Sequence, residues 1–379
     1  MKILHVGKFY PPRWGGMETA LKDICETTSS MVALSVAVAN ESGIELDESI
    51  GNVPVRRLAN WGTLFSQPIT PRLFLELCRS GAGIVHIHEP NPLAVCCFLA
   101  SSSRAKLVIH YHSDIVRQRF LARLYRPIQE AAYARAAVIV SGSQQLIDAS
   151  PVLGRWRHKC VVVPFGIDLR PYLSIERTAS LLPSMDPLVL GVGRLSYYKG
   201  FQYLIQAMRT LKARLVIAGE GEMRPSLEAL IASLGLQSRV HLAGRVSEEQ
   251  LREWYRQADV FCLSSCETSE AFGLVQIEAM AAGLPVVSTD LPTGVRAINV
   301  GGETGLVVPP HNATSLAGAI GQMLADPALR RRFGDAGRRR AMELFNRDEM
   351  GRRIVEIYRE ISSTAYLSNL SEATLGARR

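Results

Sequence analysis

The stretch Leu188-Val189-Leu190-Gly191-Val192 is an unbroken apolar run, and a loop that begins with Gly193 and Arg194 follows it. A run of this length suits a strand that is buried on both faces, as strands in parallel sheets usually are. An amphipathic segment of helical length, residues 201–211, comes after the loop. Strand and helix in this order predict an α/β fold with a parallel sheet.

The same alternation recurs along all 379 residues. Apolar runs occupy residues 3–6, 32–38, 84–88, 107–110, 137–140 and 161–164 in the first half, and 188–192, 214–218, 240–243, 259–263, 285–289 and 305–308 in the second. Two such series predict two tandem, doubly wound Rossmann-like domains that face a cleft. Prolines cluster between residues 164 and 187, where we expect the joint. The expected domains are 1–170 and 171–346, and 347–379 should supply a helix that packs back on the N-terminal domain.

Composition excludes several classes of protein. With 47% hydrophobic and 21% charged residues, the chain can bury a large core and is not a disordered or low-complexity protein. The longest unbroken apolar stretch, Leu93–Ala100, is far shorter than the about 20 residues that a membrane-spanning helix needs. Residues 1–7 lack the features of a signal peptide, and the seven cysteines lie mostly in apolar runs. We therefore expect a cytoplasmic protein with reduced cysteines.

The net charge of +8 is concentrated in the first half of the chain. Residues 1–165 hold 18 basic and 12 acidic side chains, whereas residues 166–346 are close to neutral. An excess of basic residues favours a negatively charged partner. The candidates are nucleic acid, an anionic membrane surface and a phosphorylated substrate. Composition alone leaves these three partners open.

Glycine-containing loops that follow strands are candidates for binding phosphate. Gly15 and Gly16 come after the first strand, where the start of a helix would add positive potential, although a simple glycine turn is an equal alternative. In a second loop, Arg194 and Lys199 are two cations that can clamp a diphosphate, unless they are ordinary surface residues. Ser196 stands where a dinucleotide fingerprint requires glycine, so that motif is excluded.

The segment 267–283 carries the strongest chemical signal. Residues 274–282 predict a helix, and Gly283 suits its C-terminal cap. Glu270 precedes this helix, and Glu278 lies within it among apolar neighbours, where a carboxylate needs a partner. Ribose hydroxyls would be fitting partners, and the amides at the helix start could face a phosphate. The alternative for Glu278 is a solvated helix face.

These residues resemble a known family. Glu270 and Glu278, with Phe272-Gly273 between them, are similar to the E-x7-E signature of the family 4 retaining glycosyltransferases, which have the GT-B fold. The resemblance extends over nearly the whole chain, because four further motifs match in order. They are G-G-x-E at residues 15–18, a linker motif at 163–168, G-R-L…K-G at 193–200, and a strand ending in G-E-G at 215–221.

The resemblance implies a role for each matching residue. Glu270 would hold hydroxyls of the donor sugar, and Glu278 would hold the ribose of the nucleotide. His112 would reach towards the donor sugar, although a strand-end histidine can also be purely structural. The implied catalytic residues are Glu270, His112, Arg194 and Lys199, and the implied donor-binding residues are Gly15, Gly16, Arg194, Lys199, Glu220, Glu270, Phe272, Gly273, Leu274 and Glu278.

The chain has no D-x-D triplet, the motif with which metal-dependent transferases hold a divalent ion. We therefore expect no metal cofactor, and we expect Arg194 and Lys199 to stabilise the leaving diphosphate instead. The resemblance also implies that the anomeric configuration of the sugar is retained. In that mechanism the leaving phosphate accepts the proton of the acceptor on the same face of the sugar.

The sequences of residues 110–118 and 269–275 are similar to those of bacterial mannosyl- and rhamnosyltransferases. These enzymes build surface polysaccharides such as O-antigen from GDP-sugars. We therefore expect a GDP-mannose-type donor and a lipid-diphosphate-linked or glycan acceptor. Val246 and Glu248 are candidates for recognising guanine, although Glu248 also fits the first turn of a helix that begins after Ser247. Asp114 is a candidate for orienting the acceptor.

A basic, amphipathic stretch occupies residues 104–135, where seven basic residues alternate with apolar ones. This pattern suits a peripheral enzyme that takes its acceptor from the anionic inner face of the cytoplasmic membrane. The alternative is a solvated helix with its apolar side in the core. No recognition motif for nucleic acid accompanies the basic residues, so we expect no nucleic-acid partner.

Two other functions remain compatible with the sequence. One is a UDP-sugar-dependent glycosyltransferase of the same family. The other is a non-catalytic subunit that binds a nucleotide-sugar or a membrane, although every charged residue of the motifs is present.

Overall fold

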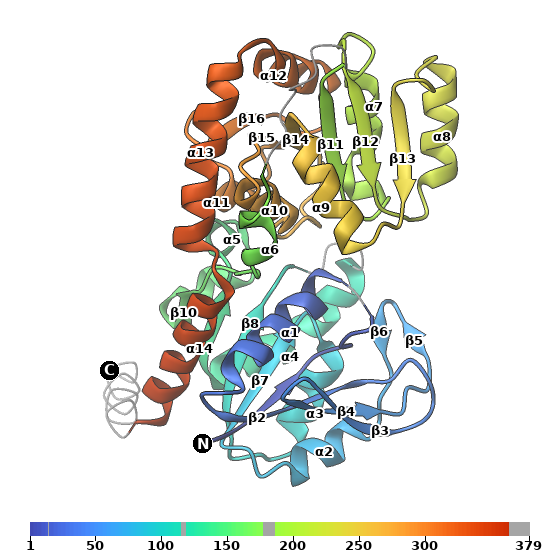
Figure 1. Cartoon of the computed structure of the whole chain (residues 1–379). Helices are drawn as coiled ribbons and strands as arrows, with labels where there is room; N and C mark the ends of the chain where they lie inside the picture. The colour runs from blue at the N-terminus through green and yellow to red at the C-terminus, as the bar shows by residue number, and fades with distance from the viewer. Residues whose placement is uncertain (14, 115–118, 177–185, 364–379) are drawn as a thin grey trace. The chain divides into compact units, whose positions relative to one another are not determined.

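The computed structural model describes residues 1–13, 15–114, 119–176 and 186–363, which form two compact units (Figure 1). The first unit comprises Met1–Gly142, Ser150–Gly166 and the chain from Arg347 onward. The second comprises Ser143–Ala149 and Ile167–Asn346. The main division, between residues 166 and 167, lies next to the boundary expected at residues 170 and 171.

The first unit is built on an eight-stranded sheet in the order β10-β9-β8-β7-β1-β2-β4-β3. All neighbouring strands are parallel except β3 and β4, which form an antiparallel edge. Strand β1 lies at the centre, so the chain winds outward from it in both directions. The strands are β1 (Lys2–Val6), β2 (Ala33–Ala39), β3 (Leu46–Ile50), β4 (Val53–Leu58), β7 (Ile84–Glu89), β8 (Lys106–Tyr111), β9 (Ala136–Ser141) and β10 (Cys160–Val162), and a separate hairpin pairs β5 (Thr63–Leu64) with β6 (Gln67–Pro68).

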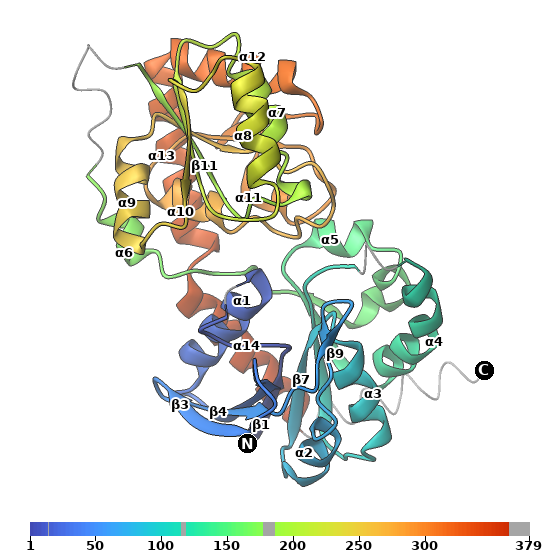
Figure 2. The same ribbon diagram turned by 90° about the vertical axis from the view of Figure 1, so that its right-hand side faces the viewer.

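Helices cover both faces of the first sheet (Figure 2). On one face α1 (Gly16–Thr28) packs against α14 (Arg347–Ser362), which comes from the far end of the chain. On the other face α2 (Leu73–Arg79) contacts α3 (Pro92–Ala100), and α3 contacts α4 (Arg119–Arg135). Because both faces are covered, the inner strands are almost wholly buried, as their apolar runs predicted.

The second unit contains a six-stranded, fully parallel sheet in the order β13-β12-β11-β14-β15-β16, the arrangement of a Rossmann fold. Its strands are β11 (Leu188–Val192), β12 (Arg214–Ala218), β13 (Val240–Gly244), β14 (Val260–Leu263), β15 (Val286–Thr289) and β16 (Gly305–Val308). Its helices are α5 (Gln144–Ala149), α6 (Arg170–Leu173), α7 (Phe201–Ala207), α8 (Arg224–Ser233), α9 (Glu248–Gln257), α10 (Val275–Ala281), α11 (Val295–Ile298), α12 (Ala313–Ala325) and α13 (Pro327–Leu344).

The order of strands fixes where a ligand can bind. Strands β11 and β14 are hydrogen-bonded neighbours, although the chain visits β12 and β13 between them. The winding direction reverses between these two strands, and ligands of open parallel sheets bind beyond the carboxyl ends of strands at such a point. Both units have the predicted doubly wound architecture, which confirms that part of the sequence-based expectation.

One glycine lets two loops at this edge approach each other closely. Gly219 follows β12 with φ +149°, and a Cβ atom there would lie 1.9 Å from the carbonyl oxygen of Gly193. The backbone N–H of Gly193 donates to the carbonyl of Ala218 at 3.0 Å. The loop that carries Arg194 is therefore positioned by a contact that no other residue at 219 would allow.

We predict that Gly219→Ala lowers the free energy of unfolding by at least about 2 kcal/mol, because the new Cβ combines backbone strain with a steric clash. The measurement is urea unfolding followed by circular dichroism. Gly318→Ala is the matched control, since no atom lies within 4 Å of its Cβ position in α12. The control should be neutral or stabilising by about 0.5–1 kcal/mol. Equal unfolding curves for the two variants would refute this account.

Candidate functional site

A buried ion pair joins the two loops that follow β11 and β14. The Lys199 ammonium donates to Glu270 Oε2 at 2.5 Å, and the hydroxyl of Ser265 donates to the same oxygen at 2.6 Å. Only 8% of Lys199 and 7% of Glu270 is exposed. The structure thus brings together two of the residues that the sequence assigned to catalysis.

The ion pair keeps Lys199 charged despite its burial. Burial by itself lowers the pKa of Lys199, but the neighbouring Glu270 carboxylate and the Tyr198 hydroxyl outweigh it, so the pKa is raised overall. The charge of Lys199 is therefore retained at neutral pH, and Glu270 has a fixed cationic partner. A carboxylate that is held in an ion pair accepts strong hydrogen bonds from hydroxyl groups.

Glu278 lies on α10 and is half-buried. The hydroxyl of Tyr255, on α9, donates to Glu278 Oε2 at 2.8 Å, and Tyr172 donates a second hydrogen bond. Burial raises the pKa of Glu278, although the two tyrosine hydroxyls act in the opposite direction. The face of α10 that carries Glu278 is therefore only partly solvated, because tyrosine hydroxyls contact its carboxylate.

Arg194 and Glu220 are exposed, unlike Lys199. The side chain of Arg194 is 72% exposed and lies 3.6 Å from Glu222, which is a weak surface contact. Glu220 accepts a hydrogen bond from Arg224 at 3.0 Å. Arg194 therefore remains available to a diphosphate, whereas Glu220 already has a cationic partner.

The backbone before α10 presents donors that the protein does not use. Gly273 has φ +77°, and its N–H and that of Leu274 donate to no acceptor within the described ranges of the chain. Phe272 is 5% exposed and packs at the same turn. The predicted phosphate-facing role of residues 272–274 stays a prediction.

The candidate base-recognition residues lie at the start of α9. Ser247 caps this helix by accepting from the N–H of Gln250 at 3.2 Å, and the Gln250 side chain accepts from the N–H of Ser247 at 2.9 Å. Glu248 occupies the first turn, where a carboxylate is favoured by the helix dipole, and its side chain is 89% exposed. Ser247 is thus the N-cap of α9, and Glu248 lies in the first turn of that helix, as the alternative described. The recognition roles of Val246 and Glu248 stay predictions.

In the first unit, Gly15 caps the N-terminus of α1, and Gly16 begins the helix. The Glu18 carboxylate turns back towards this end, because a Cβ on Gly15 would lie 2.3 Å from Glu18 Oε2. Burial raises the pKa of Glu18. A phosphate held by the amides of Gly15 and Gly16 would therefore lie close to the carboxyl group of Glu18.

His112 follows β8 and is 7% exposed. Its ring stacks on Phe165 with ring centroids 5.1 Å apart, and its Nε2 lies 3.0 Å from Nδ1 of His88. Asp114 accepts hydrogen bonds from the hydroxyls of Tyr111 and Ser150, the latter at 3.0 Å. The carboxylate of Asp114 is thus anchored to its own unit.

His112 belongs to a cluster that contains five of the eight histidines of the chain. Strand pairing explains the cluster, because His5 is in register with His86, and His88 with His110. Residues two apart on a strand point to the same face of the sheet, so His86 and His88 align with each other, as do His110 and His112. This cluster was not predicted from the sequence, although the H-x-H pattern on two neighbouring strands is a signal for it.

The rings of His88, His110 and His112 are close enough to suggest a metal site, but their orientation is unsuitable. Candidate ligand atoms of His88, His110 and His112 lie within 4.8 Å of one another. The rings of His110 and His112 are only 19° from parallel, and those of His88 and His110 only 12°. A nitrogen lone pair lies in the plane of its ring, so nearly parallel stacked rings do not direct their lone pairs at one point. The expectation that the enzyme needs no metal stays a prediction.

Family models match both units. Residues 15–166 match the model described as "Glycosyl transferase 4-like domain", and residues 174–340 match "Glycosyl transferases group 1". The D-rhamnosyltransferase WbpZ of Pseudomonas aeruginosa is 32% identical over 356 residues, covering 91% of this chain and 92% of the relative. The O-antigen chain mannosyltransferase C of Escherichia coli is 29% identical over 368 residues, covering 94% and 98%.

Solved structures agree on the fold. The sucrose-phosphate synthase of Thermosynechococcus elongatus superimposes with a TM-score of 0.79 at 25% identity, over 95% of this chain and 98% of that one. HepE from Anabaena, solved with UDP, superimposes with a TM-score of 0.78 at 21% identity, over 95% and 100%. The fold and the matching motifs define a glycosyltransferase of the GT-B class. The chain belongs to the family 4 glycosyltransferases and resembles members that build bacterial surface polysaccharides.

The buried histidines predict a steep loss of stability in acid. Burial lowers the pKa of His5 and of His112 to about 3, and it lowers the pKa values of His86, His88 and His110 well below 6.5. The unfolded chain binds these protons near pH 6.5, so stability is full above that pH and declines as the pH falls below it. Each histidine should contribute a slope of about 1.4 kcal/mol per pH unit.

His110→Phe isolates this effect, because carboxyl groups with raised pKa values, such as Glu89, are common to both proteins and cancel. We expect the slope of unfolding free energy between pH 6 and 5 to fall by about 1.4 kcal/mol per pH unit. Both ring nitrogens of His110 are buried without a partner among the described residues, so stability at pH 7 should not fall by more than about 1 kcal/mol. Exposed His241→Gln is the control, and an unchanged slope in His110→Phe would contradict the prediction.

Proposed function

We propose that this protein is a retaining, metal-independent glycosyltransferase that moves a hexose from a GDP-sugar to a lipid-linked or polysaccharide acceptor. The transferred sugar would be mannose or a related hexose, and the product would be a cell-surface polysaccharide. The observation that carries the proposal is the buried group of Lys199, Glu270 and Ser265 at the carboxyl edge of the second sheet. The similarity to the O-antigen chain mannosyltransferase and to the D-rhamnosyltransferase supports the same class of reaction.

The proposed donor contacts follow from the charges and exposures of the site. Glu270 has a cationic partner and can accept hydrogen bonds from sugar hydroxyls. Glu278 on α10 is a carboxylate that already accepts from tyrosine hydroxyls and is suited to ribose hydroxyls. Arg194 is an exposed, permanently charged guanidinium that can bind a diphosphate in a bidentate manner.

In the proposed reaction an acceptor hydroxyl oxygen forms a bond to the anomeric carbon as the bond from that carbon to the phosphate oxygen breaks. The departing diphosphate takes the hydroxyl proton, so the step needs no other base. Arg194 and Lys199 stabilise the charge that develops on the diphosphate, which is the work of a divalent ion in metal-dependent transferases. His112, in the first unit, would hydrogen-bond a substrate hydroxyl.

A UDP-sugar is the main alternative donor. HepE, a relative in fold, was solved with UDP, but at 21% identity that likeness concerns the fold alone. A mannosyltransferase (29% identical) and a rhamnosyltransferase (32% identical) are more similar in sequence to this chain than HepE is. These relatives support a mannose-type sugar, and the resemblance of residues 269–275 to transferases that use GDP-sugars favours GDP.

We predict that GDP raises the melting temperature of the protein more than UDP at equal concentration, with excess EDTA present. Transfer from GDP-mannose should also persist in EDTA. Glu270→Gln and Lys199→Met should each reduce kcat by about 100-fold or more, since each removes a charge from the buried pair. The measurements are thermal-shift titration and release of GDP.

Glu228→Gln is the matched control, because this exposed carboxylate on α8 only pairs with Arg224. Stabilisation by UDP but not by GDP would overturn the donor assignment. Loss of activity in EDTA that Mg²⁺ restores would overturn metal independence. Full turnover in Glu270→Gln would overturn the site itself.

One face of the first unit supports the proposal that the enzyme works at the inner surface of the cytoplasmic membrane. Helices α2 and α4, on the same face of the first sheet, expose large apolar side chains. The most exposed of these are Phe120 (73%) and Leu124 (63%) on α4. The alternative, a solvated helix with its apolar side in the core, would bury such residues, whereas Phe120 and Leu124 are exposed. None of the described helices is long and apolar enough to cross a bilayer.

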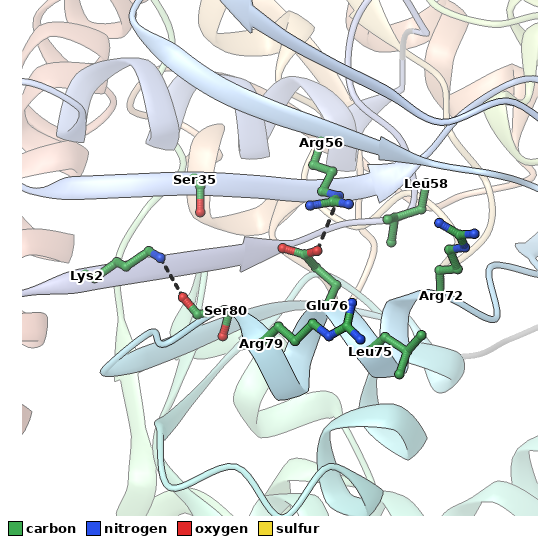
Figure 3. A pocket seen from close by; sticks show the side chains of 9 residues that line it. All are labelled: Lys2, Ser35, Arg56, Leu58, Arg72, Leu75, Glu76, Arg79 and Ser80. Carbon is green, nitrogen blue, oxygen red and sulfur yellow. Dashed lines mark hydrogen bonds and ion pairs between the residues drawn. The ribbon is translucent and has the colours of Figure 1, made fainter.

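A cationic pocket lies beneath α2 in the same layer (Figure 3). Its volume is about 300 Å³, and serine hydroxyls and one carboxylate line it beside the cations. Arg56 pairs with Glu76 at 3.3 Å, while Lys2 donates to the Ser80 carbonyl at 2.5 Å. The basic residues that line it are Lys2, Arg56, Arg72 and Arg79. Cations beside exposed apolar side chains suit an anionic lipid surface.

We predict that the double variant Phe120→Glu/Leu124→Glu reduces binding to phosphatidylglycerol vesicles by at least about tenfold, because burying each side chain in the interface is worth about 1.5–3 kcal/mol. Vesicle co-flotation measures the effect. Met342→Glu, at an exposed residue of α13, is the control and should bind normally. Equal binding of the wild type to neutral and anionic vesicles would rule out the electrostatic part of the proposal.

A further inference from the structure

A continuous hydrogen-bond chain runs from His112 to the C-terminal helix. Nε2 of His112 contacts Nδ1 of His88 at 3.0 Å, and Nε2 of His88 contacts Nδ1 of His5 at 3.2 Å. Nε2 of His5 then contacts the hydroxyl of Tyr358 on α14 at 3.1 Å, and that hydroxyl contacts Nδ1 of His86 at 2.5 Å. All four residues beyond His112 are 0% exposed.

The number of protons in this chain is fixed. Burial lowers the pKa of every histidine in it, so each ring is neutral at physiological pH and carries one N–H and one lone pair. Each contact needs one donor and one acceptor. The direction of each hydrogen bond therefore determines the direction of the next one. The tautomer of His112 thus depends on groups that are several hydrogen bonds away along the network.

The far end of the chain selects the direction. Nε2 of His86 is buried and has no partner among the described residues. If donation runs from His112 towards His86, this nitrogen carries an N–H that nothing accepts. If Tyr358 accepts from both of its neighbours, its own O–H has no acceptor. An orphaned buried donor is rarer and costlier than an unused lone pair.

One arrangement leaves no buried donor of this hydrogen-bond chain unsatisfied. In it His86 donates to Tyr358, Tyr358 to His5, His5 to His88, and His88 to Nε2 of His112. The single proton of His112 must then sit on Nδ1. Nδ1 makes no hydrogen bond in the part of the chain that the structure describes, and it is not among the fully buried polar atoms, so it reaches solvent.

We propose that Tyr358, His5 and His88 are positioning residues that hold His112 in the Nδ1–H tautomer, so that this histidine donates a hydrogen bond to substrate. The functional part of this inference rests on the role proposed above for His112, whereas the tautomer itself does not. In this state the ring offers its substrate a donor and not a base. The group that it faces, a sugar hydroxyl or an oxygen on which negative charge develops, must therefore accept the hydrogen bond from Nδ1–H.

Nuclear magnetic resonance of the full chain with ¹⁵N-labelled histidine tests the tautomer directly, because two-bond ¹H–¹⁵N correlations distinguish Nδ1–H from Nε2–H. The spectrum of His112→Asn identifies the signal of His112. We expect the Nδ1–H pattern for His112, and the exposed His158 and His241 provide reference signals. An Nε2–H pattern at His112 in the wild type overturns the proposal without the need for further variants.

Tyr358→Phe removes a single hydroxyl and keeps the ring. We expect the His112 signal to shift towards Nε2–H and kcat to fall about three- to tenfold with an unchanged KM for the donor. Tyr10→Phe is the matched control, since it removes a buried hydroxyl that has no partner among the described residues. An unchanged tautomer and kcat in Tyr358→Phe refutes the positioning role. If His112→Asn transfers the sugar as fast as the wild type, the role proposed for His112 is refuted. The tautomer measured in the wild type does not depend on that result.

Discussion

Parallel strands that are hydrogen-bonded side by side must end at the same edge of their sheet, and this constraint places the ion pair of the second unit and the histidine cluster of the first. It brings the loop after β11 next to the loop after β14, so Lys199 and Glu270 meet although 70 other residues separate them. It also sets the register of β1, β7 and β8, which stacks five histidines on one face. Both sites are therefore consequences of strand order and register.

The two units satisfy their buried polar groups in different ways. The second unit pairs a lysine with a glutamate, and the neighbouring Glu270 raises the pKa of Lys199, so the lysine stays charged inside the protein. The first unit keeps its histidines neutral and joins most of them by hydrogen bonds. A charged pair suits contact with a substrate that carries hydroxyls and phosphates, whereas a neutral chain suits holding one ring in one protonation pattern.

The sequence predicted the buried strands well, because runs such as Leu188–Val192 have no other stable position than the centre of a covered sheet. It did not predict β3 (Leu46–Ile50), whose polar residues lie on an exposed edge and carry no apolar signal. Lys199 and Glu270 were identified from motifs, but their mutual ion pair depends on the neighbouring positions of two strands. Ser265 and Tyr255 were missed, because a single serine or tyrosine within an apolar segment has no distinctive pattern.

The histidine cluster shows a similar limit of sequence reasoning. Each H-x-H pattern predicts two histidines on one face of a strand, but it does not reveal which strands are neighbours or what covers that face. Tyr358 lies 246 residues beyond His112, and no local pattern connects them. Only the packing of α14 on the first unit brings the two ends of the chain into one network.

That packing has a consequence for the order in which the protein can fold. Ribosomes make the chain from its N-terminus, and N-terminal domains generally fold first during synthesis. Here the first unit needs α14, which is made only after the whole second unit. Until then the face of its sheet that holds His5 and His86 is without this helix. The first unit therefore stays incomplete while about half of the protein is translated. Its folding is completed late, and a chain that ends before α14 would not complete it.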